Sequence, residues 1–358
     1  MEQIPNYKRI QDDILEAIAT GRFRAGQKLP TEMEMTQQYG VSRITVQRAL
    51  TELKLSGHIF RKARAGTFVA IPPQPDVVSP TFWPRRREAG ERIRIGIIAP
   101  FDLRNTSAYQ YLSGIMKALA NTEHSITLQN TQDVEQSDRV MLRNCMADRC
   151  DGIIYYPGVE QSPPIDYLIE METGGYPCVL IDKTLPCVHL PSVQPDNVGG
   201  MRAMTRHLLG KGHSRIAFVS DRGIIALNER YVGFCREMAS AGLVLTQQSF
   251  YHLGVHDSFD AEAALPQWLQ SGVTAICCAS DLHASMVLEG ARSMGISVPQ
   301  QLAITGFDGA LPEITSMAQP YEKIGECATR LLLGWINDGQ VSYAVTSLPT
   351  ELKEGITG

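Results

Sequence analysis

A short stretch starting at Ser42 carries residue types that read DNA. Ser42, Arg43 and Thr45 fall on the first turn of a predicted helix, and Ile44 and Gln47 lie on the arc opposite an apolar stripe. Arginine and glutamine can form bidentate hydrogen bonds with the edges of guanine and adenine in the major groove, and isoleucine can contact a thymine methyl group. Hydroxyls at a helix N-terminus can bind phosphate. Each residue alone also fits a solvated helix face, so the prediction depends on the surrounding elements.

A second set of polar residues follows apolar segments further along the chain. In open α/β sheets, binding sites lie at the carboxyl ends of the strands. A neutral, hydroxyl-rich ligand needs carboxylates, amides and cations in such a place. Any single one of these acids also fits a turn or a helix cap. The residues at these predicted strand ends are Asp102, Asn105, Asp182, Lys183, Asp281 and Asp308.

Three helical patterns and a hairpin surround the Ser42 stretch. Tyr7, Ile10, Ile14 and Ile18 repeat at helical spacing. A second helix starts at Thr31 with Glu34 three residues on, which is the pattern of a capping box. In the helix from Ser42, the apolar stripe is Val46, Ala49, Leu50 and Leu53, and the segment HIFRKARAGTFVA then predicts two short strands.

Charge is unevenly distributed along the 358 residues. Residues 1–70 carry 11 Lys/Arg against 7 Asp/Glu, a net +4, whereas the whole chain has 33 against 38, so the remainder is −9. A basic head on an acidic body indicates that only the head faces a polyanion.

After the head, the composition changes twice. Residues 71–92 hold five prolines and the run Arg85-Arg86-Arg87, so we expect a linker whose arginines are solvated or make an extra phosphate contact. From residue 93, apolar strand candidates alternate with helical stretches, which predicts parallel α/β sheets. This body of roughly 265 residues is larger than a single hydrophobic core usually supports, so we expect two lobes. The expected domains are a head at 1–70, a linker at 71–92 and a two-lobed body at 93–358.

Several classes of protein find no support in the sequence. No apolar run approaches the roughly 18 residues that span a membrane, and MEQIPNYKRI lacks the pattern of a secretory signal. The eight cysteines show no zinc spacing, and we expect reduced thiols. There is no GxxxxGK[ST], GxSxG or HExxH motif. We therefore expect a cytoplasmic protein that is not an enzyme and needs no metal or cofactor.

Residues 5–70 resemble the winged-helix head of the GntR family. The resemblance rests on PNYKRIQDDI, GRFRAGQKLPTE, YGVSRITVQRAL and AGTFV, in that order. It implies that the Ser42 helix enters the major groove and that the hairpin lies on the minor groove or backbone. Gln47, Met33 and Ala65 depart from the family's common residues, so the operator cannot be inferred from it. The expected DNA-binding residues are Thr31, Ser42, Arg43, Ile44, Thr45, Gln47, Arg48, Arg64 and Gly66.

The body resembles the LacI/GalR regulators and the type I periplasmic sugar-binding proteins. The resemblance rests on RIGIIAP, CDGIIYYP, PCVLIDK, PDNVGGMRAMTRHLLGKGHSRIAFV, AICCASDLHASMVLEGARSMGISVP and LAITGFDG. It implies two hinged lobes with an effector between them, gripped by Arg230 and Asp308. His256 falls roughly where the family stacks an aromatic ring, and Ser280 replaces a frequent Asn. The expected effector-binding residues are Asp102, Asn105, Tyr109, Asp182, Lys183, Asp196, Arg230, His256, Asp281 and Asp308.

The fold class expected is therefore α/β with a small α+β winged helix-turn-helix head. A GntR-like head on this body is similar to the arabinose-responsive regulators that pair the two modules. The similarity implies a homodimeric repressor of a carbohydrate operon that binds double-stranded operator DNA and is released by a sugar-like effector. Two kinds of alternative stay open: the effector is a nucleobase, a nucleoside or a sugar phosphate, or it acts as a co-repressor. An enzyme or a transport binding protein fits the sequence less well.

Overall fold

The chain forms two compact units, Met1–Thr81 and Phe82–Gly358. In the computed structural model, residues 70–90 lie outside the described part, and with them nearly all of the expected linker. The structure describes residues 6–19, 22–23, 26–55, 59–62, 66–69, 91–101, 107–131, 138–158, 163–185, 188–221, 223–246, 249–253, 259–339 and 343–358.

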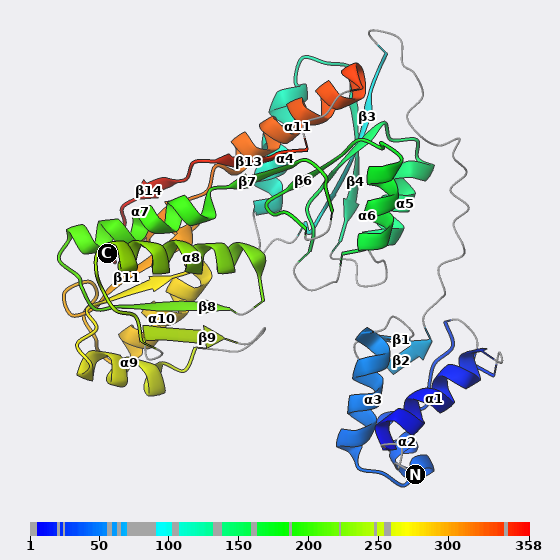
Figure 1. Cartoon of the computed structure of the whole chain (residues 1–358), viewed down its shortest axis with the longest axis horizontal. Coiled ribbons are helices and arrows are strands. Elements are labelled where there is room, and N and C mark those ends of the chain that lie inside the picture. The colour runs from blue at the N-terminus through cyan, green and yellow to red at the C-terminus, as the bar shows by residue number, and fades with distance from the viewer. Residues whose placement is uncertain are drawn as a thin grey trace. The chain divides into compact units, whose positions relative to one another are not determined.

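The first unit contains the three helices and the hairpin that the sequence predicts (Figure 1). They are α1 (Asn6–Ala19), α2 (Glu32–Tyr39), α3 (Arg43–Leu55), β1 (Ile59–Lys62) and β2 (Gly66–Val69). The two strands pair antiparallel, with Ile59 opposite Val69. This arrangement confirms a winged helix-turn-helix head.

Local signals fix the ends of α2. The Thr31 side chain accepts the backbone N–H of Glu34, and the Glu34 carboxylate accepts the backbone N–H of Thr31 at 2.7 Å, so the capping box forms. Gly40 ends the helix with φ 63°, a left-handed conformation that glycine adopts without strain. The short turn that follows leads directly into α3.

The head has its own hydrophobic core. Val46, Ala49 and Leu50 of α3 are fully buried, as the apolar stripe predicts, and pack with Ile10 and Ile14 of α1. Burying one such aliphatic side chain contributes about 1.5–3 kcal/mol. Because this core is self-contained, the outer arc of α3 is held in a fixed orientation.

The second unit is built on two six-stranded sheets. The first runs in the order β13 (Val345–Leu348), β7 (Ser192–Pro195), β6 (Cys178–Ile181), β5 (Gly152–Tyr155), β3 (Arg94–Ala99), β4 (Ser125–Asn130). The second runs β14 (Glu351–Lys353), β12 (Thr315–Ala318), β11 (Ala303–Asp308), β10 (Ala275–Cys278), β8 (Ile216–Asp221), β9 (Phe250–Leu253). Neighbouring strands pair parallel except β12 and β14. Each sheet forms one lobe.

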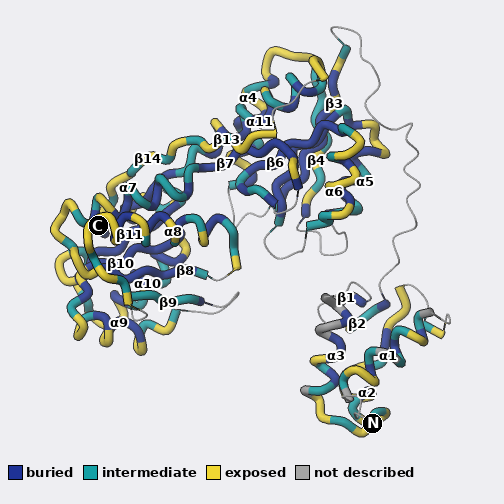
Figure 2. The backbone as a smooth tube through the Cα atoms, in the orientation of Figure 1, coloured by how far each residue is buried: buried dark blue, intermediate teal, exposed yellow. Residues whose placement is uncertain are grey.

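Helices cover both faces of the sheets, so the central strands are buried throughout (Figure 2). In the second lobe, Ile276 and Cys278 of β10 face one apolar cluster, and Ala275 and Cys277 face another. Burial on both faces explains why this strand is a continuous apolar run. The helices of this lobe are α7 (Asn197–Gly210), α8 (Ile225–Ser240), α9 (Ala261–Gln270) and α10 (Asp281–Ser293).

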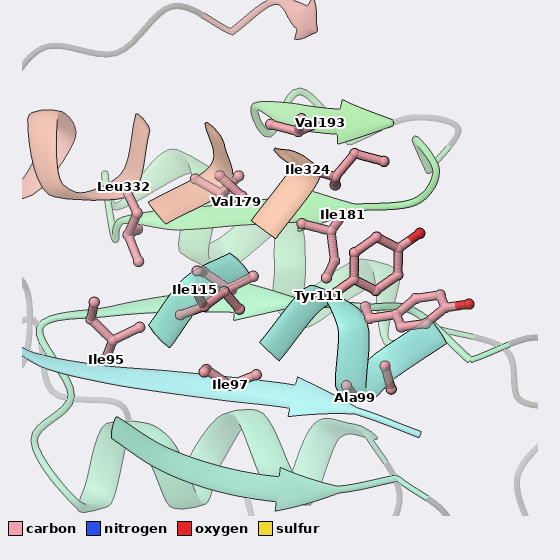
Figure 3. Close-up of a cluster of buried hydrophobic side chains, with 14 of the residues drawn as sticks. Ile95, Ile97, Ala99, Tyr111, Ile115, Val179, Ile181, Val193, Ile324 and Leu332 are labelled. Atoms are coloured by element: carbon pink, nitrogen blue, oxygen red, sulfur yellow. The ribbon is translucent and has the colours of Figure 1, made fainter. Parts of the chain in front are cut away.

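In the first lobe, α4 (Ser107–Leu119) and α11 (Tyr321–Asp338) lie side by side over one face of the sheet (Figures 1 and 3). Their side chains pack on Ile95, Ile97 and Val179. A Cβ on Gly114 would lie 1.9 Å from the Glu322 carbonyl oxygen, so glycine permits the close approach of the two helices. The remaining helices are α5 (Asp138–Ala147) and α6 (Ile165–Thr173).

The chain changes sheet three times, after β7, after β12 and after β13. The connecting residues are Asp196, Gln319-Pro320 and Pro349-Thr350. Three such connections confirm the two-lobed, periplasmic-binding-protein-like body. No helix of the described ranges combines the length and apolarity needed to cross a membrane.

Candidate functional site

On the head, a single carboxylate holds two of the predicted DNA-reading side chains. Arg43 donates from Nε to Glu32 Oε2 at 3.0 Å, and Gln47 donates from Nε2 to the same oxygen at 3.0 Å. The Arg43 side chain is 74% exposed. Glu32 lies on α2, so the first helix of the motif orients both side chains of the second. The sequence gives no sign of this role for Glu32.

The start of α3 presents hydroxyl groups. Ser42 Oγ lies 2.9 Å from Thr45 Oγ1 and accepts the Thr45 N–H at 3.3 Å. Thr31, by contrast, uses its hydroxyl within the capping box, where it donates to Glu34 at 2.9 Å. The exposed helix start suits phosphate, because free N–H groups and the helix dipole both favour an anion there.

The remaining predicted head residues lie beside this face or outside the description. The Arg48 guanidinium stacks 3.9 Å from the Tyr7 ring centroid, which fixes it against α1. Gly66 opens β2 with φ 123°, and a Cβ there would lie 2.7 Å from Lys28 Cε. Lys28 is thus an exposed cation beside the hairpin that sequence reasoning missed. The Ile44 side chain and Arg64 lie outside the described residues.

In the second lobe, Arg230 is the centre of a polar cluster. It is 3% exposed and donates to Asn197 Oδ1 at 2.9 Å, to the Ala279 carbonyl at 2.7 Å and to Asp308 Oδ1 at 3.0 Å. Its guanidinium lies 3.9 Å from the Phe307 ring centroid. Arginine suits this place because its planar fork stays charged when buried and stacks on an aromatic face.

Asp308 ends β11 beside this arginine. Gln319, in a connection between the lobes, donates from Nε2 to Asp308 Oδ1 at 2.6 Å. Burial raises the pKa of the Asp308 carboxyl, and the Arg230 guanidinium opposes that rise. The Asp308 backbone has φ 124°, a strained conformation for a residue with a side chain. Such strain often marks a functional position.

The first lobe contributes a matching set. Tyr111 donates to Asp182 Oδ1 at 2.8 Å, and Lys183 Nζ lies 3.7 Å from Asp182 Oδ2. Lys183 is 7% exposed and its Nζ lies 5.4 Å from the Tyr156 ring centroid. Asp182 has φ 75°, so an aspartate with strained backbone follows a strand in each lobe.

Two tyrosines lie within electrostatic reach of both sets. Burial raises the pKa of Tyr321, and Asp308 of one lobe and Asp182 of the other raise it further. Burial likewise raises the pKa of Tyr156, with contributions from the same two carboxylates. The Tyr321 ring lies 5.2 Å from that of Tyr111, which donates to Asp182, and Gln319 two residues earlier donates to Asp308, so these contacts link the two sets. We call the following residues the interlobe cluster: Tyr156, Asp182, Lys183, Arg230, Asp308, Gln319 and Tyr321.

Two predicted effector residues have structural partners instead. Asp196 caps α7 by accepting the Gly199 N–H at 2.7 Å. Asp281 is 2% exposed; its Oδ1 accepts Ser316 Oγ at 2.5 Å and its Oδ2 accepts the Ala310 N–H at 2.6 Å. These carboxylate oxygens already accept hydrogen bonds from a helix N-terminus and from a loop. We therefore do not propose Asp196 or Asp281 as ligand-binding residues.

Of the other predicted effector residues, the structure describes Tyr109. Tyr109 is 40% exposed on α4, and its ring lies 5.6 Å from that of Phe101. Asp102, Asn105 and His256 lie outside the described residues. The residues that sequence reasoning missed are Tyr156, Gln319 and Tyr321. Tyr156 directly follows an apolar strand, and this position is a signal by which the sequence could have identified it as a site residue.

Two regions of the chain match known protein families. Residues 6–69 match the bacterial regulatory proteins of the gntR family, and residues 205–357 match the periplasmic binding protein-like domain. With the fold described above, these matches define the chain as a DNA-binding transcriptional regulator with a GntR-type head and a periplasmic-binding-protein-like body.

Individual relatives match most of the chain. The chain is 25% identical to an arabinose metabolism transcriptional repressor of Geobacillus stearothermophilus, over 94% of this chain and 93% of the relative. It is also 25% identical to the protein of that name in Halalkalibacterium halodurans, over 92% and 89%. Among solved structures, transcription regulator CcpA of Lactococcus lactis shares the fold with a TM-score of 0.63 and 22% identity, over 75% of this chain and 100% of that one.

Proposed function

We propose that the chain represses genes of sugar utilisation and that a small polyol, bound at the interlobe cluster, releases it from DNA. The observation that carries the proposal is the Arg230–Asp308 pair, 3.0 Å apart, with its buried arginine, in the same interlobe cluster as Asp182 and Lys183. Similarity to arabinose metabolism repressors supports a sugar as the ligand class. A role on operator DNA supports the proposal that the protein acts in the cytoplasm.

The hydrogen-bond donors and acceptors of the interlobe cluster suit a ligand with hydroxyl groups. Within the described residues, Gln319 Oε1 is buried without a hydrogen-bond partner, and Lys183 Nζ lies 3.7 Å from Asp182 Oδ2, beyond hydrogen-bond distance. Acceptors and donors are thus mixed. A hydroxyl both donates and accepts, so a polyol can satisfy such a set. The rings of Tyr156 and Tyr321 offer apolar faces for the carbon skeleton.

Lys183 favours a second candidate, a sugar phosphate. Lys183 is 7% exposed and its Nζ lies 3.7 Å from Asp182 Oδ2, so its ammonium group can donate hydrogen bonds to an anionic ligand. A phosphate would supply strong acceptors. Thermal shift assays with L-arabinose, L-arabinose 5-phosphate, D-ribose and adenosine distinguish the candidates. A true ligand at a hundredfold excess over its Kd stabilises by about 2.7 kcal/mol. Stabilisation by adenosine alone would contradict both sugar candidates.

For the head, we propose that two copies bind a two-fold symmetric operator through α3. A homodimer would place two heads on half-sites about one helical turn apart. Arg43, Gln47, Ser42 and Thr45 then face base edges and phosphates, with Glu32 as the group that aligns the first two. The exposed Arg43 side chain supports this assignment.

Replacing Arg43 by alanine is expected to weaken specific DNA binding by about 1–3 kcal/mol, because one forked base contact is lost. Arg22→Ala is the matched control: it removes the same charge from an arginine that is not part of α3 and pairs with Asp13 at 3.2 Å. Fluorescence anisotropy at fixed salt measures both variants. Equal losses in both would mean that Arg43 contributes charge alone.

Effector and operator are expected to weaken each other's binding by the same factor. A ligand between the lobes favours their closed arrangement, and closure would change the spacing of the two heads of a dimer. Couplings of this kind are typically about 1–3 kcal/mol, or roughly 5–150-fold. The measurement is a pair of titrations, DNA with and without effector, then effector with and without DNA. Equal affinities within each pair would leave a ligand site without a switch, and tighter DNA binding would indicate a co-repressor.

A further inference from the structure

The end of α5 brings two cysteines of the first lobe together. The Cys150 N–H donates to the Cys145 carbonyl at 2.9 Å, and the Arg149 N–H donates to the Met146 carbonyl at 3.0 Å. These two backbone hydrogen bonds form a Schellman motif, in which the third residue from the helix end and the second residue beyond the cap commonly make a side-chain contact. In α5, these two positions are Cys145 and Cys150.

Further contacts hold this turn in place. Arg149 has φ 55°, the left-handed conformation that the motif requires. The Arg94 guanidinium of β3 donates to the Asp148 carbonyl at 2.6 Å, and the Tyr176 hydroxyl donates to the Cys150 carbonyl at 2.6 Å. A disulfide needs two cysteines whose side chains already point toward each other, and this fixed turn provides such a pair.

The two thiols differ in their surroundings. Cys145 is fully buried and Cys150 is 5% exposed. A Cβ on Gly96 of β3 would lie 2.8 Å from Cys145 Sγ, so glycine leaves the space that this sulfur occupies. A hydrogen bond from the Cys145 thiol lowers the pKa of Cys150 against the effect of burial, and the Thr127 side chain lowers it further. The same hydrogen bond raises the pKa of Cys145, so Cys150 is the thiol of the pair that ionises first.

We propose that Cys145 and Cys150 form a site of oxidative modification, at which a hydroperoxide converts the two thiols into an intramolecular disulfide. The Cys150 thiolate attacks one oxygen of hydrogen peroxide, the O–O bond breaks, and the hydroxide that leaves takes up the Cys150 proton as water. The Cys145 sulfur then attacks the sulfur of the resulting sulfenic acid. The S–O bond breaks, and hydroxide leaves with the Cys145 proton as a second water.

Pairing, and not exposure, selects this site among the cysteines that the structure describes. Cys235 and Cys327 are half-buried and so more accessible than either member of the pair. Cys277 and Cys278 are consecutive in β10, but their side chains lie in different apolar clusters on opposite faces of the sheet. The proposed site uses no residue of the interlobe cluster, so it does not depend on the identity of the effector.

The experiment treats the full-length protein with hydrogen peroxide, blocks the remaining thiols in denaturant and maps the peptides by mass spectrometry. The chain is expected to lose two of its eight thiols. Trypsin cuts after Arg149 and a glutamate-specific protease cuts after Glu172, so Cys145, Cys150 and Cys178 fall on three separate peptides. The peptides of Cys145 and Cys150 should stay joined until a reductant is added.

Cys235→Ser is the matched control, because it removes a more accessible thiol of the other lobe and should leave the joined peptides unchanged. Cys145→Ser and Cys150→Ser should each abolish them. Phenylarsine oxide, which bridges two adjacent thiols, should bind wild type and Cys235→Ser but neither variant of the pair. The wild-type map requires no substitution, so a variant that fails to fold leaves the test intact. Wild type without joined peptides, or with Cys145 or Cys150 joined to Cys178 or to a second chain, would overturn the proposal.

Discussion

Arg230→Ala is expected to abolish measurable effector binding and to lower the free energy of unfolding by about 3–5 kcal/mol. The guanidinium is 3% exposed and satisfies Asn197, the Ala279 carbonyl and Asp308. Removing one partner of a buried ion pair leaves an uncompensated charge, which accounts for a loss of this size. Calorimetry with the effector and chemical denaturation measure the two losses separately.

Two variants separate the roles of Arg230. Arg230→Lys keeps the positive charge but loses the planar guanidinium group. This variant should therefore lose less of the free energy of unfolding than Arg230→Ala, while its affinity for the effector stays low. Arg202→Ala removes a 41% exposed arginine that pairs with Glu237 at 2.9 Å, and should cost no more than about 1 kcal/mol. Full effector affinity in Arg230→Ala would remove this residue from the site, however unstable the variant proved.

Strong local patterns account for what the sequence predicts well. The stripe from Val46 to Leu53 and the capping box at Thr31 predict the head, because each is decided within one helix turn or face. The apolar runs that became β3, β5, β6 and β8 predict the sheets for a similar reason: their burial on both faces requires uninterrupted apolar residues.

The weaker strands could not be predicted, since tertiary position decides them. β12 has the sequence TSMA and is buried at every residue, yet only its neighbours β11 and β14 make it a strand. β7, with the sequence SVQP, is buried in the same way beside β6. Because the sequence does not predict β12, it also does not predict that Gln319 and Tyr321, which follow this strand, lie at the site.

Aspartates at strand ends show the same limit within the site. Asp182, Asp196, Asp281 and Asp308 all follow or end a strand, and their sequence contexts look alike. In the structure, Asp196 caps a helix and Asp281 ties a loop through Ser316 and Ala310, whereas Asp182 and Asp308 join the interlobe cluster. Which backbone N–H groups surround a carboxylate depends on loops that local sequence does not fix.

The isolated head, residues 1–70, is expected to bind a two-half-site operator about 100- to 10,000-fold more weakly than the full chain. The head has its own core and forms a separate compact unit, so it should fold alone. One head gains only its own contacts. In a dimer the second head binds intramolecularly, at an effective concentration in the millimolar range, and avidity rises accordingly.

Salt dependence gives an independent reading of the same prediction. Each phosphate neutralised contributes about −0.9 to the slope of log K against log salt, so one head should show roughly half the slope of the dimer. Fusing the head to a parallel two-stranded coiled coil should restore much of the lost affinity, because it replaces the proposed pairing by the body. If the isolated head matched the full chain in affinity and slope, the two-headed mode of binding would be wrong, and the body would have to act on DNA binding within a single chain.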